Sequence, residues 1–279
     1  MNFDLKTIVT KRYSVRTFNK KPVEKETRQA LLSYAASLDN PFGPHIRVQF
    51  IERENAANGE KLGTYGVIKG AKLFMGVTVA DKPNAALAVG YEFEKLVLYA
   101  ASLGLGTCWL GGTFNRSAFA EAMEIKEGEI FSILSPLGYA ANAKSLTEKL
   151  MRFGIKADHR LAWSEIFFDK CLETPLTEEY SGPYRFALEM LRLAPSAVNK
   201  QPWRIVICNN AVHFYKKGLA AAEMLGIDMQ SIDLGIAMCH FDLAVQQEGM
   251  TGHFEMNDPQ LDAPGLQYVA SWISEISDK

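Results

Sequence analysis

The order of apolar and polar positions predicts a chain in which helices and strands follow one another throughout. Apolar side chains at helical spacing predict a helix over 24–38, after Pro22-Val23, and the opening residues are expected to form a first helix. A longer, central helix is expected over Ala86–Leu103, where one face is apolar and Gly104 follows as a C-cap. Strands or short extended pieces are predicted at Ile46–Glu52, Ala71–Ala80, Thr107–Leu110, Ile130–Tyr139, Ile166–Phe168 and Trp203–Cys208.

A weak self-similarity relates the two halves of the chain. Arg28, Ala30, Leu31 and Arg47 recur 157 positions later as Arg185, Ala187, Leu188 and Arg204, and Leu98, Gly104 and the aromatic Trp109 recur 145 positions later as Leu243, Gly249 and the aromatic Phe254. Four identities in a block can arise by chance, but the elements also recur in the same order: helix, strand, long helix, glycine, strand. We therefore expect a duplication, with the second copy shorter than the first.

Composition and charge then exclude several classes of protein. The 279 residues, 48% hydrophobic and 22% charged, are enough for one or two domains with a proper core. A net charge of −2 gives no general attraction to nucleic acid or to anionic membranes, and no run is long and apolar enough to predict a membrane span. Asp4 and Lys6 interrupt the opening residues, so a secretion signal is not expected.

The spacing of the cysteines and histidines does not indicate a metal site. The four cysteines and five histidines are dispersed, without the spacing of a metal site. We therefore expect no metal, and we expect the cysteines to be reduced core thiols of a cytoplasmic protein.

Two arginines four positions apart form the first candidate for a ligand site. Within the stretch KRYSVRTF, Arg12 and Arg16 stand on either side of Ser14, and such a set can bind a phosphate group bidentately with an added hydroxyl hydrogen bond. The alternative is a basic helix end that the helix dipole favours.

Two further stretches suit a flat, polar ligand. The glycines of GLGTCWLGG, residues 104–112, allow a backbone to approach a ring closely, although Gly104 alone is explained as a C-cap. The loop in LRLAPSAVNKQPWRI, residues 191–205, collects small and amide side chains between a helix and a strand. Its alternative reading is an ordinary helix-to-strand turn, which Pro, Ser and Asn form for local backbone reasons.

Together these stretches resemble the FMN-dependent nitroreductase family over nearly the whole chain. The matching motifs are R-x-S-x-R-x-F, the glycine-rich segment and Pro-Ser-Ala-x-Asn-x-Gln-Pro-Trp-Arg. The resemblance implies an α/β (α+β) nitroreductase-like fold, with two tandem half-repeats that each have a central, mainly antiparallel sheet flanked by helices. It also implies FMN as the cofactor. In that family the Pro-Ser loop of one subunit reaches across a dimer interface into the flavin site of the other.

The resemblance assigns the phosphate end of the flavin to one group of residues. Arg12 and Ser14, on either side of Tyr13, would hold the phosphate and the ribityl chain. Arg160 matches the family's late basic residue on the phosphate, with Asp158 where the family often has a second basic residue.

The resemblance assigns the ring to a second group. Arg16 would lie near N1 and O2, and Gly111 and Gly112 would contact N5. The loop residues expected at the flavin are Pro195, Ser196, Ala197, Asn199 and Gln201, with Asn199 or Gln201 at the pyrimidine edge. We nominate no catalytic side chain, because the cofactor performs the transfer itself.

Each half of the chain lacks what the other has kept. Where the first half would have its own Pro-Ser loop, Phe42 replaces Asn199 and Pro44 replaces Gln201, and the second half has no R-x-S-x-R. One complete site therefore remains, and we expect a fused pseudo-dimer with a single FMN. Residues 1–171 would supply the phosphate and N5 side, and residues 172–279 the PSAVNKQPW loop.

The implied activity is that of an FMN-dependent NAD(P)H oxidoreductase. Such an enzyme passes electrons to an electron-poor small molecule, for example a nitroaromatic or a quinone, which alternates with the nicotinamide in one pocket. No G-x-G-x-x-G motif is present, which suits a shared open site. Two alternatives stay open: a flavin-binding protein without NAD(P)H turnover, and a flavoenzyme that remodels one specific metabolite. Further association into homo-oligomers is compatible with each.

Overall fold

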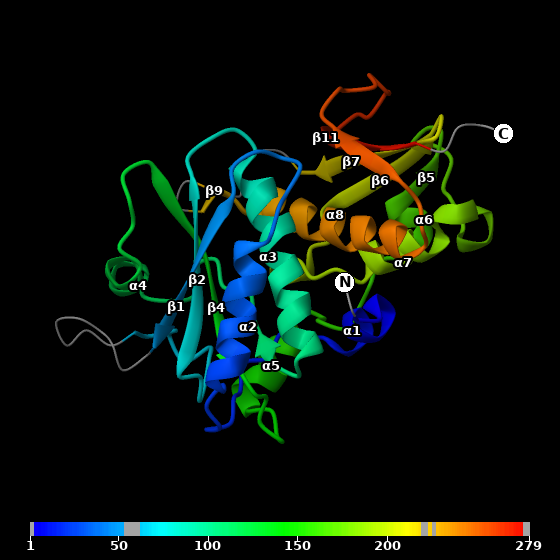
Figure 1. The fold of residues 1–279 in the computed structure, drawn as a ribbon. Helices are drawn as coiled ribbons and strands as arrows, with labels where there is room; N and C mark the ends of the chain where they lie inside the picture. Colours follow the sequence, from blue (N-terminus) through cyan, green and yellow to red (C-terminus); the bar gives the residue numbers. More distant parts are fainter. Residues whose placement is uncertain (1–2, 53–61, 219–222, 225–226, 276–279) are drawn as a thin grey trace.

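Two long helices cross in the middle of the molecule. The structure, a computed structural model, describes residues 3–52, 62–218, 223–224 and 227–275. Helix α3 (Ala85–Ser102) and helix α8 (Met229–Gln247) pack on each other, and Figure 1 shows a sheet on either side of this pair. Both helices are apolar around most of their circumference, which is typical of helices enclosed by other elements rather than of helices at a surface.

The two sheets have matching strand orders. The first consists of β1 (Ile46–Glu52), β2 (Leu73–Ala80), β3 (Gly106–Thr107) and β4 (Glu129–Gly138). The second consists of β5 (Phe167–Asp169), β6 (Trp203–Cys208), β7 (Ala211–Lys217), β10 (Gly252–Glu255) and β11 (Leu266–Ser274). The first sheet has the order β1-β2-β4-β3 and the second the order β10-β11-β7-β6-β5. Read from β6 outward, the second sheet repeats the antiparallel order of the first, and β5 adds a parallel strand beside β6.

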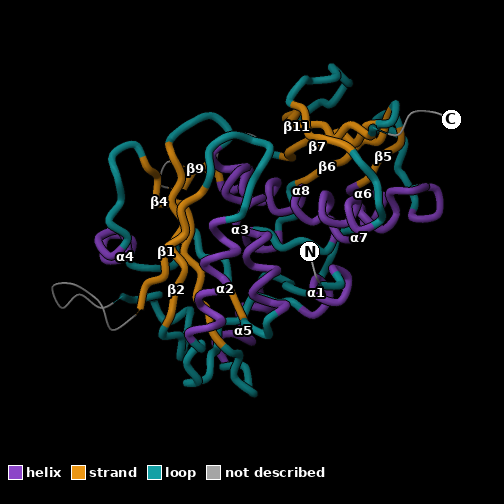
Figure 2. Tube along the Cα trace, viewed as in Figure 1, coloured by secondary structure: helices purple, strands orange, loops and turns teal. Residues whose placement is uncertain are grey.

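The remaining helices lie around this core, as Figure 2 shows in purple. They are α1 (Leu5–Lys11), α2 (Lys25–Ala36), α4 (Arg116–Ala122), α5 (Leu146–Gly154), α6 (Trp163–Ile166) and α7 (Arg185–Arg192). Helix α2 packs beside α3 and helix α7 beside α8, and α1 contacts both long helices. A short hairpin of β8 (Glu223–Met224) and β9 (Ile227–Asp228) precedes α8.

Glycines allow the two long helices to approach closely. A Cβ atom placed on Gly90 would lie 2.1 Å from the carbonyl oxygen of Ile232, and one on Gly235 would lie 2.2 Å from that of Leu87. Any larger residue at either position would therefore force the two backbones apart. The two glycines are 145 positions apart, and so are Leu87 and Ile232, which is the spacing of the sequence repeat.

Most elements predicted from the sequence are present at or near the expected positions. The strand at Ile46–Glu52 is observed with the predicted bounds, and the long helix runs from Ala85 to Ser102. The first helix is observed as Leu5–Lys11, with residues 1 and 2 outside the described part of the chain. The predicted extended piece Thr107–Leu110 is shorter than expected: β3 covers Gly106–Thr107, and Leu110 forms an isolated bridge with Leu134.

Helices α4 and α5 occupy stretches for which no element was predicted. In α5 the side chains of Leu146, Leu150 and Phe153 recur at helical spacing but remain exposed, so the helix shows its periodicity without a buried face. The fold as a whole is mixed α/β, with antiparallel and mixed sheets flanked by helices, as the sequence predicts.

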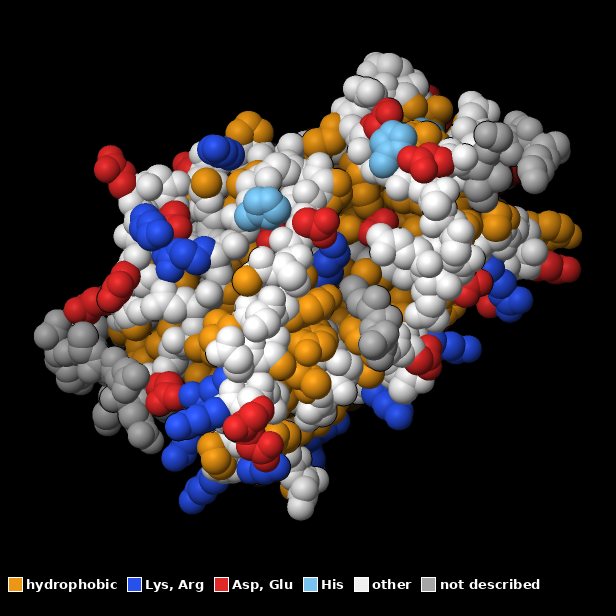
Figure 3. Space-filling view, viewed as in Figure 1, with side chains coloured by type: hydrophobic (Ala, Val, Ile, Leu, Met, Phe, Trp, Pro, Cys, Tyr) orange, Lys and Arg blue, Asp and Glu red, His pale blue; other side chains and the backbone are white. Residues whose placement is uncertain are grey.

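The surface has no single dominant charge on the face drawn in Figure 3, where acidic and basic side chains are interspersed. Among the helices of the described residues, none combines the length and apolar character that a membrane span requires. The same described residues contain no group of three or more histidine, cysteine, aspartate or glutamate side chains placed to hold a metal ion.

Candidate functional site

One cavity lies where the two halves of the chain meet. Its walls come from the segment after α1, the end of β3, the stretch after α5, the loop before β6 and the first two turns of α8. The cavity is partly open to solvent and has room for about 170 Å³ of water-sized spheres. The residues that line it and enter the description below are Arg12, Tyr13, Ser14, Arg16, Trp109, Gly111, Arg152, Asp158, Arg160, Pro195, Ser196, Ala197, Val198, Asn199, Met229, Ile232, Asp233 and Ile236.

The segment after α1 is extended, which explains how its motif is presented. Ser14 forms a parallel bridge with Thr107, and the N–H of Val15 donates to the carbonyl oxygen of Thr107 at 2.9 Å. Side chains two positions apart on extended backbone point to the same side. Arg12, Ser14 and Arg16 therefore face the cavity together, while Val15 between them is buried in the core.

Arg160 approaches the same group of cations from the opposite wall. Its guanidinium donates to the carbonyl oxygens of Ala157, His159 and Leu193 at distances of 2.9 to 3.2 Å. Burial, followed by repulsion from Arg12, lowers the pKa of Arg160 to about 10. Bringing a bound anion among these arginines would relieve both effects, since it would compensate the positive charges in a buried place.

Three arginine nitrogens in the cavity wall have no partner. The Nε atoms of Arg12, Arg16 and Arg160 are buried and make no hydrogen bond with any of the described residues. A buried N–H without an acceptor costs about 1–3 kcal/mol, so native structures rarely retain several in one place without a ligand to satisfy them. The cavity thus presents donors for an anion at one end.

The loop before β6 is held in a strained backbone conformation. Val198, Asn199 and Gln201 all have positive φ, at 46°, 58° and 50°. A left-handed conformation is unfavourable for a branched residue such as Val198, and such strain concentrates at binding and active sites. The side chain of Ser196 stabilises the loop by accepting from the N–H of Gln201 at 2.9 Å.

Of the two amide side chains in this loop, Asn199 lines the cavity and Gln201 does not. Asn199 lines the cavity, and its Oδ1 accepts from Arg160 at 3.2 Å, so it lies beside the cluster of arginines. Gln201 does not line the cavity: it is buried, and its Oε1 accepts from the N–H of Leu161 at 3.0 Å. Gln201 therefore fixes the loop from behind, whereas Asn199 faces the cavity.

The part of the wall formed by α8 is more apolar, with Met229, Ile232 and Ile236. A Cβ atom on Gly111 would lie 2.5 Å from the terminal methyl of Met229, so the glycine leaves room for this side chain of α8. The indole N–H of Trp109 donates to Glu94 at 2.9 Å, and the other oxygen of Glu94 lies 3.0 Å from His240. Trp109 is thus held by a buried polar chain that links both long helices.

Asp233 is a buried carboxyl group in the wall of this cavity. Its Oδ1 accepts from the N–H of Ala197 at 2.9 Å, and its Oδ2 is buried without a hydrogen-bond partner among the described residues. Burial raises the pKa of Asp233 to about 8, against the smaller lowering effect of the Ala197 N–H.

Ten of the twelve residues predicted from the sequence line this one cavity, although they come from four separate stretches of the chain. The two others are Gln201, described above, and Gly112, which is exposed next to the lining residue Gly111.

The wall formed by α8 was not predicted. Met229, Ile232, Asp233 and Ile236 lie on one face of that helix, at the spacing i, i+3, i+4 and i+7. The available signal was the carboxylate of Asp233 within a mainly apolar helical run.

Comparisons with protein families and with solved structures show which known proteins this chain resembles. The model of the family described as "Putative TM nitroreductase" matches residues 4–245, which includes the arginine motif, the glycine-rich segment and the strained loop. No curated protein matched the chain.

A search of solved structures found the same fold over nearly the whole chain in one structure. A structure described as a "putative nitroreductase" from Thermotoga maritima is 15% identical with a TM-score of 0.61, and the match covers 98% of this chain and 94% of that one. A nitroreductase with bound FMN from Bacteroides fragilis is 17% identical with a TM-score of 0.41, over 52% of this chain and 92% of its own. An FMN-dependent nitroreductase from Clostridium difficile is 19% identical with a TM-score of 0.40, over 50% and 88%.

Proposed function

The chain belongs to the nitroreductase family whose model matches residues 4–245, and from this we propose that it is an FMN-dependent oxidoreductase that takes electrons from NAD(P)H. The acceptor would be an electron-poor small molecule, such as a nitroaromatic or a quinone. One observation carries the proposal: ten residues expected to contact FMN, separated widely in sequence, line a single cavity.

The residues present fit FMN at both ends of the cavity. The buried, unpartnered Nε atoms of Arg12 and Arg160 suit a phosphate dianion, which accepts several charge-assisted hydrogen bonds, and that of Arg16 suits the polar N1 and O2 edge of the ring. The apolar surface of Met229, Ile232 and Ile236 on α8 suits the flat body of a flavin ring.

Each residue would have a definite task in the reaction. Bound FMN would supply hydride transfer at N5 and pass the electrons on to the acceptor. Arg12 and Arg160 would hold the phosphate, with Asn199 keeping Arg160 in place through its 3.2 Å hydrogen bond. Arg16 would place a positive charge at the N1 and O2 side, where it favours the reduced cofactor.

We further propose that the chain is an internal duplication with one flavin site, divided into residues 1–171 and 172–279. The strand orders of the two sheets match, and the residues in contact where the long helices cross are related by the spacing of 145 positions. Helix α2 also packs on α3 as helix α7 packs on α8. The cavity takes lining residues from both halves.

A second site, built from the residues that the repeat relates to the cavity residues, would fall where aromatic rings are packed. At the repeat spacings, Asn199, Ile236 and Trp109 of the cavity correspond to Phe42, Tyr91 and Phe254. The ring of Phe42 lies 5.4 Å from those of Tyr91 and Phe254, measured between centroids, and Phe42 is buried.

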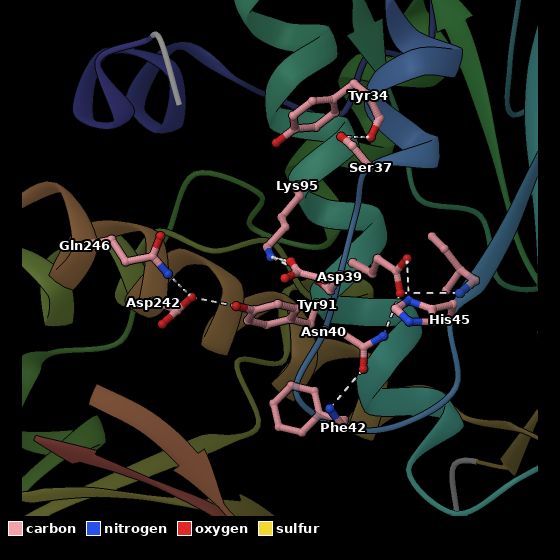
Figure 4. Close-up of polar contacts among 12 residues, drawn as sticks. Tyr34, Ser37, Asp39, Asn40, Phe42, His45, Tyr91, Lys95, Asp242 and Gln246 are labelled. Atoms are coloured by element: carbon pink, nitrogen blue, oxygen red, sulfur yellow. Dashed lines mark hydrogen bonds and ion pairs between the residues drawn. The ribbon is translucent and has the colours of Figure 1, made fainter. Parts of the chain in front are cut away.

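Polar contacts fix this packing, as Figure 4 shows for Phe42 and Tyr91. The side chain of Asn40 accepts from the N–H of Phe42 at 2.9 Å, and Tyr91 donates to Asp242 at 2.5 Å. These contacts support a single FMN per chain, because a second flavin would have to displace a packed aromatic cluster.

The experiment that tests the proposed function begins with the purified protein. We expect a yellow protein whose extracted cofactor has the mass of FMN, and FAD or haem as the sole ligand would contradict the assignment. Addition of NADH or NADPH should then bleach the bound flavin rapidly. A flavin that binds but is not bleached by either nicotinamide would favour the alternative of a flavin-binding protein without turnover.

A further inference from the structure

The carboxyl group of Asp233 is placed to meet a bound ligand. It is 3% exposed, it belongs to the cavity wall, and only one of its two oxygens has a partner among the described residues. That partner, the N–H of Ala197, lies in the strained loop that carries five of the residues expected to contact FMN. Asp233 thus joins helix α8 to this loop and leaves Oδ2 for the ligand.

We propose that Asp233 is a neutral carboxylic acid whose Oδ2 donates a hydrogen bond to an acceptor atom on the polar edge of the flavin ring. The inference rests on the proposed function, since it concerns how that same cavity binds FMN. A protonated Oδ2 is a donor, and the oxidised ring offers carbonyl oxygens and unprotonated ring nitrogens as acceptors.

The neighbours of Asp233 place it at the ring rather than at the phosphate. Met229, Ile232 and Ile236 share its face of α8 and form the apolar end of the cavity, and Met229 reaches Gly111. The charges that act on Asp233 are Asp228 and Lys200, and no arginine of the phosphate cluster is among them. An ionised carboxylate at this place would be buried, and Lys200, the cation that acts on it, offsets only a small part of that cost.

The repeat explains why a second such donor is not expected. The residue 145 positions before Asp233 is Ala88, which is fully buried in α3 and has no polar side chain. The donor therefore belongs to the one complete site.

The surrounding titratable groups do not obscure the ionisation of Asp233. Around the cavity these are Arg12, Tyr13, Arg16, Arg152, Asp158 and Arg160, together with Lys200 in the loop and Asp228, which caps the N-terminus of α8. Arg160, with a pKa of about 10, begins to lose its proton only near the upper end of the range tested, and Asp233→Asn, which keeps Arg160, controls for that loss. Burial raises the pKa of Tyr13, and Asp158 is paired with Arg152. The second ionisation of the FMN phosphate has its midpoint near pH 6, so it is nearly complete before the pH at which Asp233 ionises.

The test compares FMN affinity in wild type, Asp233→Asn and Asp233→Ala from about pH 6.5 to about pH 9.5, followed by flavin fluorescence. The asparagine keeps both hydrogen bonds, because Oδ1 accepts from Ala197 and Nδ2 donates to the ring. We expect wild-type affinity to fall about tenfold above pH 8, Asp233→Asn to bind as wild type at pH 7 without that fall, and Asp233→Ala to bind about tenfold more weakly at all pH values.

Each result decides the matter. A wild-type affinity that does not change with pH, the same fall in Asp233→Asn, or an Asp233→Ala variant that binds as tightly as wild type would each overturn the role of Asp233. Far-UV circular dichroism and thermal unfolding separate a weaker binder from an unfolded one. If wild type binds no FMN at any pH, the proposed function itself fails, which is a distinct outcome.

Discussion

Gly90 and Gly235 lie opposite one another where α3 and α8 cross. A Cβ atom on either glycine would overlap a carbonyl oxygen of the other helix, at 2.1 Å and 2.2 Å respectively, and the Cα of Gly90 is itself within 3.0 Å of the Cβ position on Gly235. The contact is reciprocal, because the residues touched, Ile232 and Leu87, differ by the same 145 positions as the glycines. Such self-complementary contact is the geometry of a two-fold interface, here within one chain.

The crossing predicts a matched pair of stability effects. Gly90→Ala and Gly235→Ala should each lower the free energy of unfolding by about 3 kcal/mol, because the new methyl group overpacks a backbone contact that cannot relax through a flexible side chain. Chemical denaturation measures both. Gly154→Ala at the end of α5 is the control: no atom lies within 4 Å of the new methyl, so the variant should be as stable as wild type or slightly more stable. If alanine at Gly90 and Gly235 changed the free energy of unfolding as little as it does at Gly154, the reciprocal crossing would be contradicted.

Replacing Arg12 should mainly change the affinity for FMN, whereas replacing Arg16 should mainly change its reduction potential. Arg12→Ala should weaken FMN binding about 10- to 100-fold, because a charge-assisted hydrogen bond to the phosphate is lost in both redox states. Arg16→Ala should instead lower the reduction potential of bound FMN by a few tens of mV, since a cation beside N1 favours the reduced form. Affinity by fluorescence titration and potential by redox titration measure the two.

The control for this pair is a surface arginine. Arg185 is exposed and pairs with Glu178, away from the cavity, so Arg185→Ala should change neither affinity nor potential. An unchanged potential in Arg16→Ala would refute the role given to Arg16, whatever its affinity.

Asp233 should make the stability of the apoprotein depend on pH. Its pKa rises from about 4 in the unfolded chain to about 8 in the fold, so the folded chain keeps a proton that the unfolded chain releases. Stability should therefore fall as the pH rises from about 4 to about 8. Asp233→Asn removes this fall and should be more stable than wild type above pH 4, by an amount that grows to a few kcal/mol near pH 8. Urea unfolding of both proteins at several pH values measures the difference, and parallel pH profiles would contradict it.

Removing a ring from the aromatic cluster should destabilise the protein without creating a second FMN site. Phe42→Ala should lower the free energy of unfolding by about 3–5 kcal/mol, because Phe42 is buried between Tyr91 and Phe254. It should leave the number of bound FMN molecules unchanged, since the place still lacks the paired arginines of the other site. Thermal unfolding and a flavin titration of the same variant test both statements.

The sequence predicted the parts of this molecule that depend on local chemistry. The strand at Ile46–Glu52 and the long helix from Ala85 to Ser102 follow from periodicity, and the ten predicted lining residues come from motifs with fixed spacing. Their meeting in one cavity required the fold, since Arg12 and Asn199 are far apart in sequence.

What the sequence did not predict depends on packing between distant elements. Helix α5 exposes the apolar side chains that would mark it, so its pattern does not indicate a buried face. Asp233 becomes part of the site only because Gly90 and Gly235 bring α8 against α3 and its first turns over the cavity. Gln201 shares a motif with Asn199, yet its hydrogen bond to the N–H of Leu161 turns it away from the cavity.

The number of flavins that one chain binds tests the account most directly. Apoprotein titrated with FMN by calorimetry should bind one molecule per chain, because one cavity presents unpartnered arginines and the place related to it by the repeat is filled by Phe42, Tyr91 and Phe254. A second flavin would leave polar groups buried without partners, at about 1–3 kcal/mol each. If chains associate further, the ratio should stay at one. A reproducible ratio of two FMN per chain, or no binding at all, would contradict the single site at the seam of the two halves.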